Sequence, residues 1–225
     1  MKQILLIAGL VILVSTFCLA ESPVALTLRM KGDILLIRGD DESSLSEGTP
    51  LINQDILNSQ DDSFAFIKFI DDGATLRLFA NTILTINTER EEEKLNKSSF
   101  LRIGNVFLNV NSRRGNYEIE TPTTVASVKG TEGFVEAEDD GTTYVVTLKS
   151  VFEVENTISG RKADVPAGYT CKSSPNGELE VYQTEEINEE WLEAIEDMPE
   201  SERNLLKIEL LNQEDERRTI EIELE

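Results

Sequence analysis

Turn-forming residues interrupt this sequence at short, fairly regular intervals between Val24 and about Tyr182. The runs between them alternate apolar and polar residues, as at positions 64–69, 75–79 and 143–148. A period of two is typical of strands with one buried face, and no helical period runs through this region. The chain is therefore predicted to form a mainly β fold of short strands joined by tight turns.

The tripeptide Asp-Asp-Gly occurs at 71–73 and again at 139–141, each time between two strand-like runs. Glycine tolerates the positive φ that the favoured hairpin turns require. The sequence therefore predicts two β-hairpins centred on these turns.

Two elements recur along the chain. Positions 30–37 and 102–110 share a turn glycine followed by an alternating strand, and 148–154 repeats the strand without the glycine. Glycine-containing loops also recur, at 45–51 and at 165–169. Such repetition indicates related units that lie beside one another and bury faces that none could bury alone.

The segment 117–136 reads as a strand, a Thr121-Pro122 corner, a second strand, a Gly130-Thr131 break and a third strand. Together with the glycine-spaced strands on either side, it resembles the core signature of the FecR domain family. In that family, a Thr-Pro is followed by alternating apolar residues, then by Arg-Gly-Thr, one residue and Phe.

Two positions depart from this pattern. Lys129 stands where Arg is usual, and Gly133 adds one residue before Phe134, which suggests a small bulge.

The resemblance covers about residues 30–170. It implies a β-roll or short β-solenoid-like domain at 24–183, located outside the cytoplasm, that contacts other proteins and has no catalytic residues. The signature residues are expected to be structural: Thr121, Pro122, Gly130, Thr131 and Phe134.

The first twenty residues have the order of parts found in a secretory signal peptide. Lys2 precedes an apolar run at 4–14, and small residues end at Ala20, so cleavage is expected before Glu21. The alternative is a retained membrane helix, since about 17 residues is the lower limit for spanning. A lipid-bearing Cys18 is disfavoured, because such signals place a small residue before the cysteine and this chain has Phe17.

Cleavage at that position leaves Cys171 as the single cysteine, so the mature fold cannot close an intramolecular disulfide. We expect Cys171 to behave as a small, buried or half-buried apolar residue, with a reactive or intermolecular thiol as the less favoured alternative.

The charge of the chain excludes several functions. There are 43 acidic against 21 basic residues, a net charge of −22, and no histidine. Such a surface repels nucleic acid and anionic headgroups. The commonest general base and metal ligand is missing, as are Ser-His and Cys-His nucleophile pairs.

Acidic clusters are the groups numerous enough to suggest a site. Paired carboxylates serve glycoside hydrolysis, but nothing in the sequence selects a pair. The acids at 71–72 and 139–140 lack the ligand spacing of a calcium loop, and those at 40–47 come nearer in spacing but lack its central glycine. We interpret all three as turns, with weak opportunistic cation binding as the alternative. The charged segment 88–97 is expected to be a solvated loop or a strand-end excursion, with a partner-binding acidic loop as the alternative.

The composition changes near Thr184. Apolar residues at helical spacing predict an amphipathic helix over 185–198. Pro199 ends this helix and can begin a second one, and the alternation from Thr219 predicts a strand. Residues 184–225 are thus predicted to be a helix-helix-strand extension. Its possible partner contacts are Trp191, Ile220, Ile222 and Leu224, although Trp191 more often anchors such a helix to its own domain.

These features lead to two functional hypotheses. The first is a secreted or periplasmic, non-enzymatic binding or scaffolding module that contacts an envelope protein or a cell-wall polysaccharide and needs no cofactor or metal. The second is a sensor subunit of a transmembrane signalling relay of the sigma-regulator type that lacks its own cytoplasmic arm. An enzyme is the least favoured reading.

Overall fold

The computed structural model describes residues 22–91, 94–110, 117–128, 130–184, 205–211 and 217–223. The chain divides into two compact units, residues 1–182 and 183–225. Across the described ranges the regular structure consists of strands without helices, which confirms the mainly β class. No helix in these ranges is long and apolar enough to cross a membrane. The β-roll or short solenoid arrangement stays a prediction.

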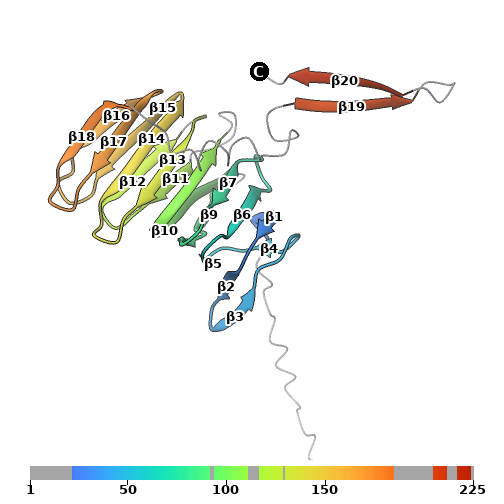
Figure 1. The fold of residues 1–225 in the computed structure, drawn as a ribbon, viewed down its shortest axis with the longest axis horizontal. Coiled ribbons are helices and arrows are strands. Elements are labelled where there is room, and N and C mark those ends of the chain that lie inside the picture. The colour runs from blue at the N-terminus through green and yellow to red at the C-terminus, as the bar shows by residue number, and fades with distance from the viewer. Residues whose placement is uncertain are drawn as a thin grey trace, which may run out of the picture. The chain divides into compact units, whose positions relative to one another are not determined.

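The first unit contains two sheets that share the long strand β10 (Lys94–Asn109) and curl together (Figure 1). Sheet A runs, in spatial order, through β4 (Pro50–Leu51), β1 (Ala25–Lys31), β6 (Phe64–Phe69), β7 (Thr75–Leu78), the end of β10, β13 (Glu132–Ala137), β14 (Thr143–Lys149) and β17 (Tyr169–Ser173). Sheet B runs through β3 (Asp41–Ser44), β2 (Ile34–Arg38), β5 (Ile56–Ser59), β8 (Ile83–Thr85), the start of β10, β11 (Tyr117–Glu120), β12 (Thr124–Val128), β15 (Val151–Asn156) and β16 (Lys162–Pro166). The strand β9 (Thr88–Glu91) pairs with the start of β10, and β18 (Leu179–Gln183) follows β17. These pairs are antiparallel, except that β10 and β11 run parallel.

Strand β10 joins the two sheets because it pairs along both of its edges. One edge contacts β9, β8 and β7 in turn, and the other contacts β11 and then β13. The passage from sheet B to sheet A occurs at Gly104, whose φ is 99°. A positive φ is easily adopted only by glycine, so this residue lets one strand serve both sheets.

The repeat seen in the sequence corresponds to three corners at which the chain passes between sheets. Gly32, Gly104 and Ser150 occupy equivalent places and have φ of 76°, 99° and 64°. A hydroxyl from a neighbouring segment binds the backbone of the residue after each corner. Ser63 accepts the amide of Asp33 at 2.9 Å, Thr82 accepts that of Asn105 at 2.9 Å, and Thr131 donates to the carbonyl of Val151 at 2.9 Å.

Both predicted hairpins are confirmed. β6 pairs with β7 across the first Asp-Asp-Gly turn, and β13 pairs with β14 across the second. In each turn the second aspartate accepts a backbone amide two residues later, Asp72 from Ala74 at 2.9 Å and Asp140 from Thr142 at 2.7 Å. The expected bulge is also present, as a register shift between Glu132 and Gly133.

The apolar faces of both sheets line one hydrophobic core, which includes Leu57, Leu76, Leu84, Val106 and Ile119. Part of sheet A is buried on its other face as well. Phe107 and Phe134 point away from this core, are 1% and 0% exposed, and have ring centroids 4.9 Å apart. The central strands of sheet A therefore have no solvated face, which explains why their sequences are apolar at consecutive positions.

Two predictions from charge and periodicity are wrong. Residues 88–97 are not a solvated loop, because β9 and the start of β10 form a hairpin there. The helix predicted from Pro199 does not extend over Leu205–Leu211, which is strand β19 and pairs antiparallel with β20 (Arg217–Glu223). The predicted strand from Thr219 is confirmed by β20.

The remaining predictions for the chain ends concern residues that the structure does not describe. The signal segment 1–20, the helix 185–198 with Trp191, and Leu224 all lie outside the described ranges. Ile220 and Ile222 lie on β20 in the second unit, and a contact with a partner stays a prediction for both.

Candidate functional site

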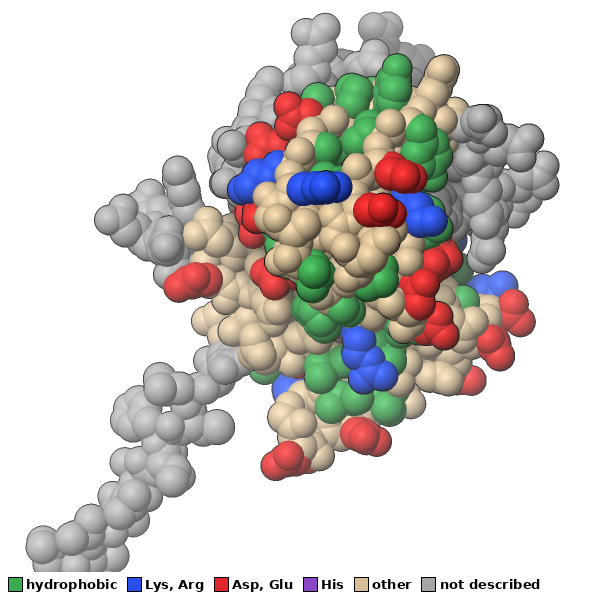
Figure 2. All heavy atoms as spheres, turned by 90° about the vertical axis from the view of Figure 1, so that its left-hand side faces the viewer, with side chains coloured by type: hydrophobic (Ala, Val, Ile, Leu, Met, Phe, Trp, Pro, Cys, Tyr) green, Lys and Arg blue, Asp and Glu red, His purple; other side chains and the backbone are tan. Residues whose placement is uncertain are grey.

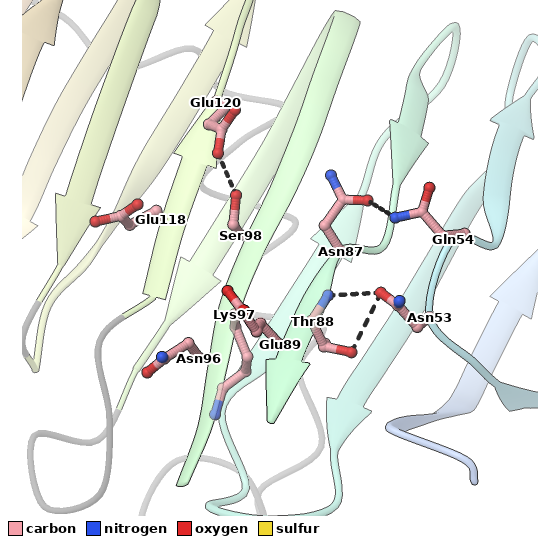
Figure 3. A pocket seen from close by; sticks show the side chains of 10 residues that line it. All are labelled: Asn53, Gln54, Asn87, Thr88, Glu89, Asn96, Lys97, Ser98, Glu118 and Glu120. Atoms are coloured by element: carbon pink, nitrogen blue, oxygen red, sulfur yellow. Dashed lines mark hydrogen bonds between the residues drawn. The ribbon is translucent and has the colours of Figure 1, made fainter. Parts of the chain in front are cut away.

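A polar hollow of about 490 Å³ lies against sheet B where β9, β10 and β11 meet (Figure 3). Its lining comes from three regions of the sequence: the turn before β5, the β8–β9 segment, and the paired strands β10 and β11. The lining residues are Asn53, Gln54, Asn87, Thr88, Glu89, Asn96, Lys97, Ser98, Glu118 and Glu120.

Strand alternation decides which side chains reach the hollow. On β10, Asn96 and Ser98 are half-buried and lie toward the hollow, whereas Leu95, Lys97 and Ser99 are buried. On β11, Glu118 and Glu120 line the hollow, whereas Tyr117 and Ile119 belong to the core. The parallel pairing of Ser98 with Glu118 sets these side chains beside one another.

Hydrogen bonds hold one wall of the hollow in place. Asn53 Oδ1 accepts the backbone amide of Thr88 at 2.7 Å and its hydroxyl at 3.3 Å. Gln54 donates from Nε2 to Asn87 Oδ1 at 2.8 Å (Figure 3). The Asn87 amide therefore has a fixed orientation, with its NH₂ group turned away from Gln54 and available as a donor.

The opposite wall carries carboxylates whose oxygens are partly occupied. Ser98 donates to Glu120 Oε1, and Ser127 donates to Glu118 Oε1 at 3.1 Å. Each carboxylate keeps a further oxygen that can accept. Glu89 adds a third negative charge to the lining. The hollow therefore presents amide donors and acceptors, hydroxyls and carboxylates, with no apolar side chain in its lining.

Lys97 also lines the hollow, but its ammonium is turned away from it and lies against two aspartates. Nζ is 2.7 Å from Asp71 Oδ2 and 2.7 Å from Asp72 Oδ2, and the lysine side chain is 0% exposed. The ring of Phe69 lies 5.5 Å from the ammonium and 5.3 Å from the ring of Tyr117. Burial, together with the charge of Asp72, raises the pKa of the Tyr117 hydroxyl.

The family signature residues lie outside the hollow. Thr121 is buried and contacts Thr143 through their hydroxyls at 2.8 Å, and Pro122 is exposed at the adjoining corner. Gly130 has a φ of 75°, beside the Thr131 whose hydroxyl binds a corner of the fold. Phe134 is packed among aromatic rings on sheet A. A structural role for these five residues stays a prediction.

Other candidate groups do not form a site. Cys171 is free and fully buried, as expected, and its burial raises the pKa of the thiol to about 12. On the side shown in Figure 2, the Asp and Glu side chains are scattered rather than gathered. Among the described residues, no group of three or more Cys, Asp or Glu side chains is arranged to hold a metal ion.

Sequence reasoning did not identify the hollow, because its residues come from separate strands between positions 53 and 120. One signal was present: the charged segment 88–97, with a partner-binding role as its alternative interpretation. Thr88, Glu89, Asn96 and Lys97 from that segment do line the hollow. The interpretation stays a proposal, although the segment is a hairpin and not a loop.

Comparison with solved structures finds proteins whose fold has limited similarity to that of this chain. Two crystal structures of a protein from Parabacteroides distasonis described as a putative anti-sigma factor are 17% and 16% identical in sequence, with TM-scores of 0.49 and 0.48. Each alignment covers 57% of this chain and 59% of that protein, so the chain spans about three-fifths of its length. No curated protein matches the sequence.

Comparison with protein-family models finds a match over the middle of the chain. Residues 55–151 match the model described as FecR protein, which confirms the resemblance found in the sequence. The match runs from the end of the β4–β5 turn to the start of β15, and it includes Asn87, Ser98 and Glu118 of the hollow. This chain therefore contains a FecR domain at residues 55–151.

Proposed function

We propose that this chain is a non-enzymatic, extracytoplasmic binding module that contacts cell-wall polysaccharide through the polar hollow on sheet B. The observation that carries the proposal is the lining, which consists of amides, hydroxyls and carboxylates. Such groups pair with the many hydroxyls of a sugar, each of which both donates and accepts. The fixed amides of Asn53 and Asn87 support the proposal, because an ordered site loses little entropy on binding.

The charge of the hollow narrows the ligand further. Glu89, Glu118 and Glu120 line it, and the ammonium of Lys97 is turned away and paired with two aspartates. An anionic polymer would be repelled by these carboxylates. We therefore favour a neutral or amine-bearing polysaccharide over a phosphate-rich or uronic acid polymer.

Co-sedimentation with purified, protein-free cell-wall polysaccharide tests the proposal. The full chain should pellet with the polymer, and both Glu118→Gln and Asn87→Ala should weaken this by about tenfold each, since one lost hydrogen bond to a ligand costs about 1.4 kcal/mol. Asp164→Asn is the matched control, because Asp164 is exposed on β16, away from the hollow. Equal pelleting of all variants would contradict the proposal, as would release of reducing ends from the polymer.

The FecR domain itself favours a second candidate function. In this alternative the chain is a sensor subunit of a sigma-regulator type relay that lacks its own cytoplasmic arm. Cross-linking in the native host followed by purification should then recover a membrane-bound regulator or transporter. Repeated recovery of the chain without one would count against the relay.

Both functions require export. A cleaved signal peptide at 1–20 predicts a chain that begins at Glu21 in the soluble fraction of the host. The N-terminus and intact mass of the native protein test this, and a chain that retains the apolar segment in the membrane fraction would favour the anchored relay subunit.

A further inference from the structure

We propose that Lys97 and Asp72 become joined by an amide bond formed within the folded chain, with Asp71 as the residue that transfers the proton. This cross-link would connect β10 to the β6–β7 turn. It concerns the opposite side of sheet B from the polar hollow and is independent of the proposed function.

The first argument is proximity. Lys97 Nζ lies 2.7 Å from Asp72 Oδ2, and the two side chains are 0% and 2% exposed. An amine held against a carboxyl group in a fixed geometry reacts as though it were present at about 10⁵ M or more. A surface ion pair lacks this constraint, because its long side chains sample many rotamers.

The second argument is the environment of the pair. The ring of Phe69 lies 5.5 Å from Lys97 Nζ, and the buried ring of Tyr117 packs on Phe69. These rings and the burial of both side chains exclude bulk water from the contact, and so from the bond that forms there.

The third argument is that the two aspartates have different surroundings. Asp72 Oδ1 accepts the backbone amide of Ala74 at 2.9 Å, so a donor is already aimed at the oxygen that becomes negative when Cγ is attacked. Asp71 binds the amine through Oδ2 at 2.7 Å, whereas its Oδ1 is buried without a hydrogen-bond partner among the described residues. These contacts assign Asp72 as the residue whose Cγ atom is attacked and Asp71 as the residue that carries the proton.

The step is a condensation that needs no oxidant. The ammonium of Lys97 first gives one proton to Asp72 Oδ2, and the neutral amine then attacks Asp72 Cγ. Once the N–C bond has formed, the Lys97 nitrogen must lose a second proton. Asp71 takes this proton and delivers it to Asp72 Oδ2. That oxygen departs as water when the C–O bond breaks, so the products are one amide and one water, and Asp71 is unchanged.

A covalent link here would substitute for a missing disulfide. Cys171 is the free, buried cysteine of the described residues, and no second cysteine is available to it there. The Lys97–Asp72 bond would close a loop across a separation of 25 residues. Closing a loop of that size restricts the unfolded chain much as a disulfide does.

Tryptic peptide mass spectrometry of the full chain tests the proposal, because trypsin does not cut after an acylated lysine. Peptide 69–77 should be found joined to peptide 95–102, at the sum of their masses less one water. Fragmentation should place the bond on Asp72. The exposed pair Lys162–Glu155, whose atoms are 2.8 Å apart, should remain unlinked in the same digest.

Variants separate the roles. Lys97→Arg and Asp71→Ala should each abolish the linked peptide, whereas Asp139→Ala, at the equivalent position of the second Asp-Asp-Gly turn, should leave it intact. Free peptides 95–97 and 98–102 in the digest of the unsubstituted protein, without the linked species, would overturn the proposal. A linked peptide that persists in Asp71→Ala would overturn the assignment of the proton carrier.

Discussion

Gly104 and Thr82 lie so close together that a Cβ atom on Gly104 would stand 2.3 Å from the Oγ1 atom of Thr82 and 2.6 Å from its Cα. The contact exists because Thr82 Oγ1 accepts the amide of Asn105, the residue after the corner, at 2.9 Å. Gly32 and Ser63 repeat the arrangement at the preceding corner, with a corresponding Cβ–Oγ distance of 2.4 Å. Close approach of a glycine to a hydroxyl-bearing segment therefore recurs at two of the three corners.

This relationship predicts that Gly104→Ala is far more destabilising than alanine at another positive-φ glycine. Gly48 has a φ of 79°, and a Cβ added to it would meet nothing within 4 Å, so Gly48→Ala should cost only the left-handed backbone penalty, about 1 kcal/mol. Gly104→Ala adds a clash with backbone atoms and should cost about 3 kcal/mol or more. Urea denaturation measures both, and equal losses would show that the corner yields easily.

The Arg38–Asp55 ion pair supplies a second prediction. Asp55 is 0% exposed and accepts Arg38 Nε at 2.8 Å, an Arg38 NH₂ group at 2.7 Å and the amide of Ile52 at 2.8 Å. Asp55→Ala should reduce the free energy of unfolding by about 2 kcal/mol. The loss is smaller than for an ion pair with both partners buried, because the half-exposed Arg38 can be solvated once its partner is removed. Glu155→Ala, which breaks the exposed pair with Lys162, should produce no measurable change. Equal effects would contradict the distinction.

A third prediction concerns pH. Burial, and then the charge of Glu138, raise the pKa of Glu136 above its ordinary value of 4.5. The folded state therefore holds this proton more tightly than the unfolded state, so stability is lost as the pH rises from 4.5 through the folded pKa. Glu136→Gln should gain stability over the parent at pH 7 and lose that advantage below pH 4.5. Parallel denaturation curves at the two pH values check this, and an advantage that is the same at both would disprove the assignment.

Cys171 gives a fourth prediction. Its thiol is fully buried and its pKa is raised to about 12, so the reactive thiolate is nearly absent at pH 8 in the folded protein. Iodoacetamide should therefore modify Cys171 only as fast as the chain unfolds, and rapidly once urea is added. Modification of the folded protein at the rate of a free cysteine would show that this edge of sheet A opens.

Local sequence signals predict the elements that local chemistry determines. The two Asp-Asp-Gly hairpins need only turn residues and flanking alternation, and both are present. The corner repeat is visible through Gly32 and Gly104, although the third corner uses Ser150 in the same positive-φ conformation. The bulge beside Gly133 is likewise predicted, from one extra residue in the signature.

Features that depend on distant residues cannot be predicted in this way. Lys97 lies in what the sequence indicates is a solvated charge run, because its partners, Asp71 and Asp72, are supplied by a turn 25 residues earlier. The strand β19 lies where the sequence predicts a helix, because a short apolar run has no distinctive period and the strand that pairs with it, β20, comes later in the chain. The hollow requires the pairing of β10 with β11, which no local pattern specifies.

The proposed function requires the hollow of sheet B to bind a hydroxyl-rich polymer. The most direct test is a titration of the ¹⁵N-labelled full chain with soluble neutral cell-wall oligosaccharides, followed by amide chemical shifts. Binding in the hollow should produce saturable shifts at Asn87, Asn96, Ser98, Glu118 and Glu120, with the amides of the second unit unaffected. Unchanged spectra, or shifts confined to residues away from these five, would contradict it.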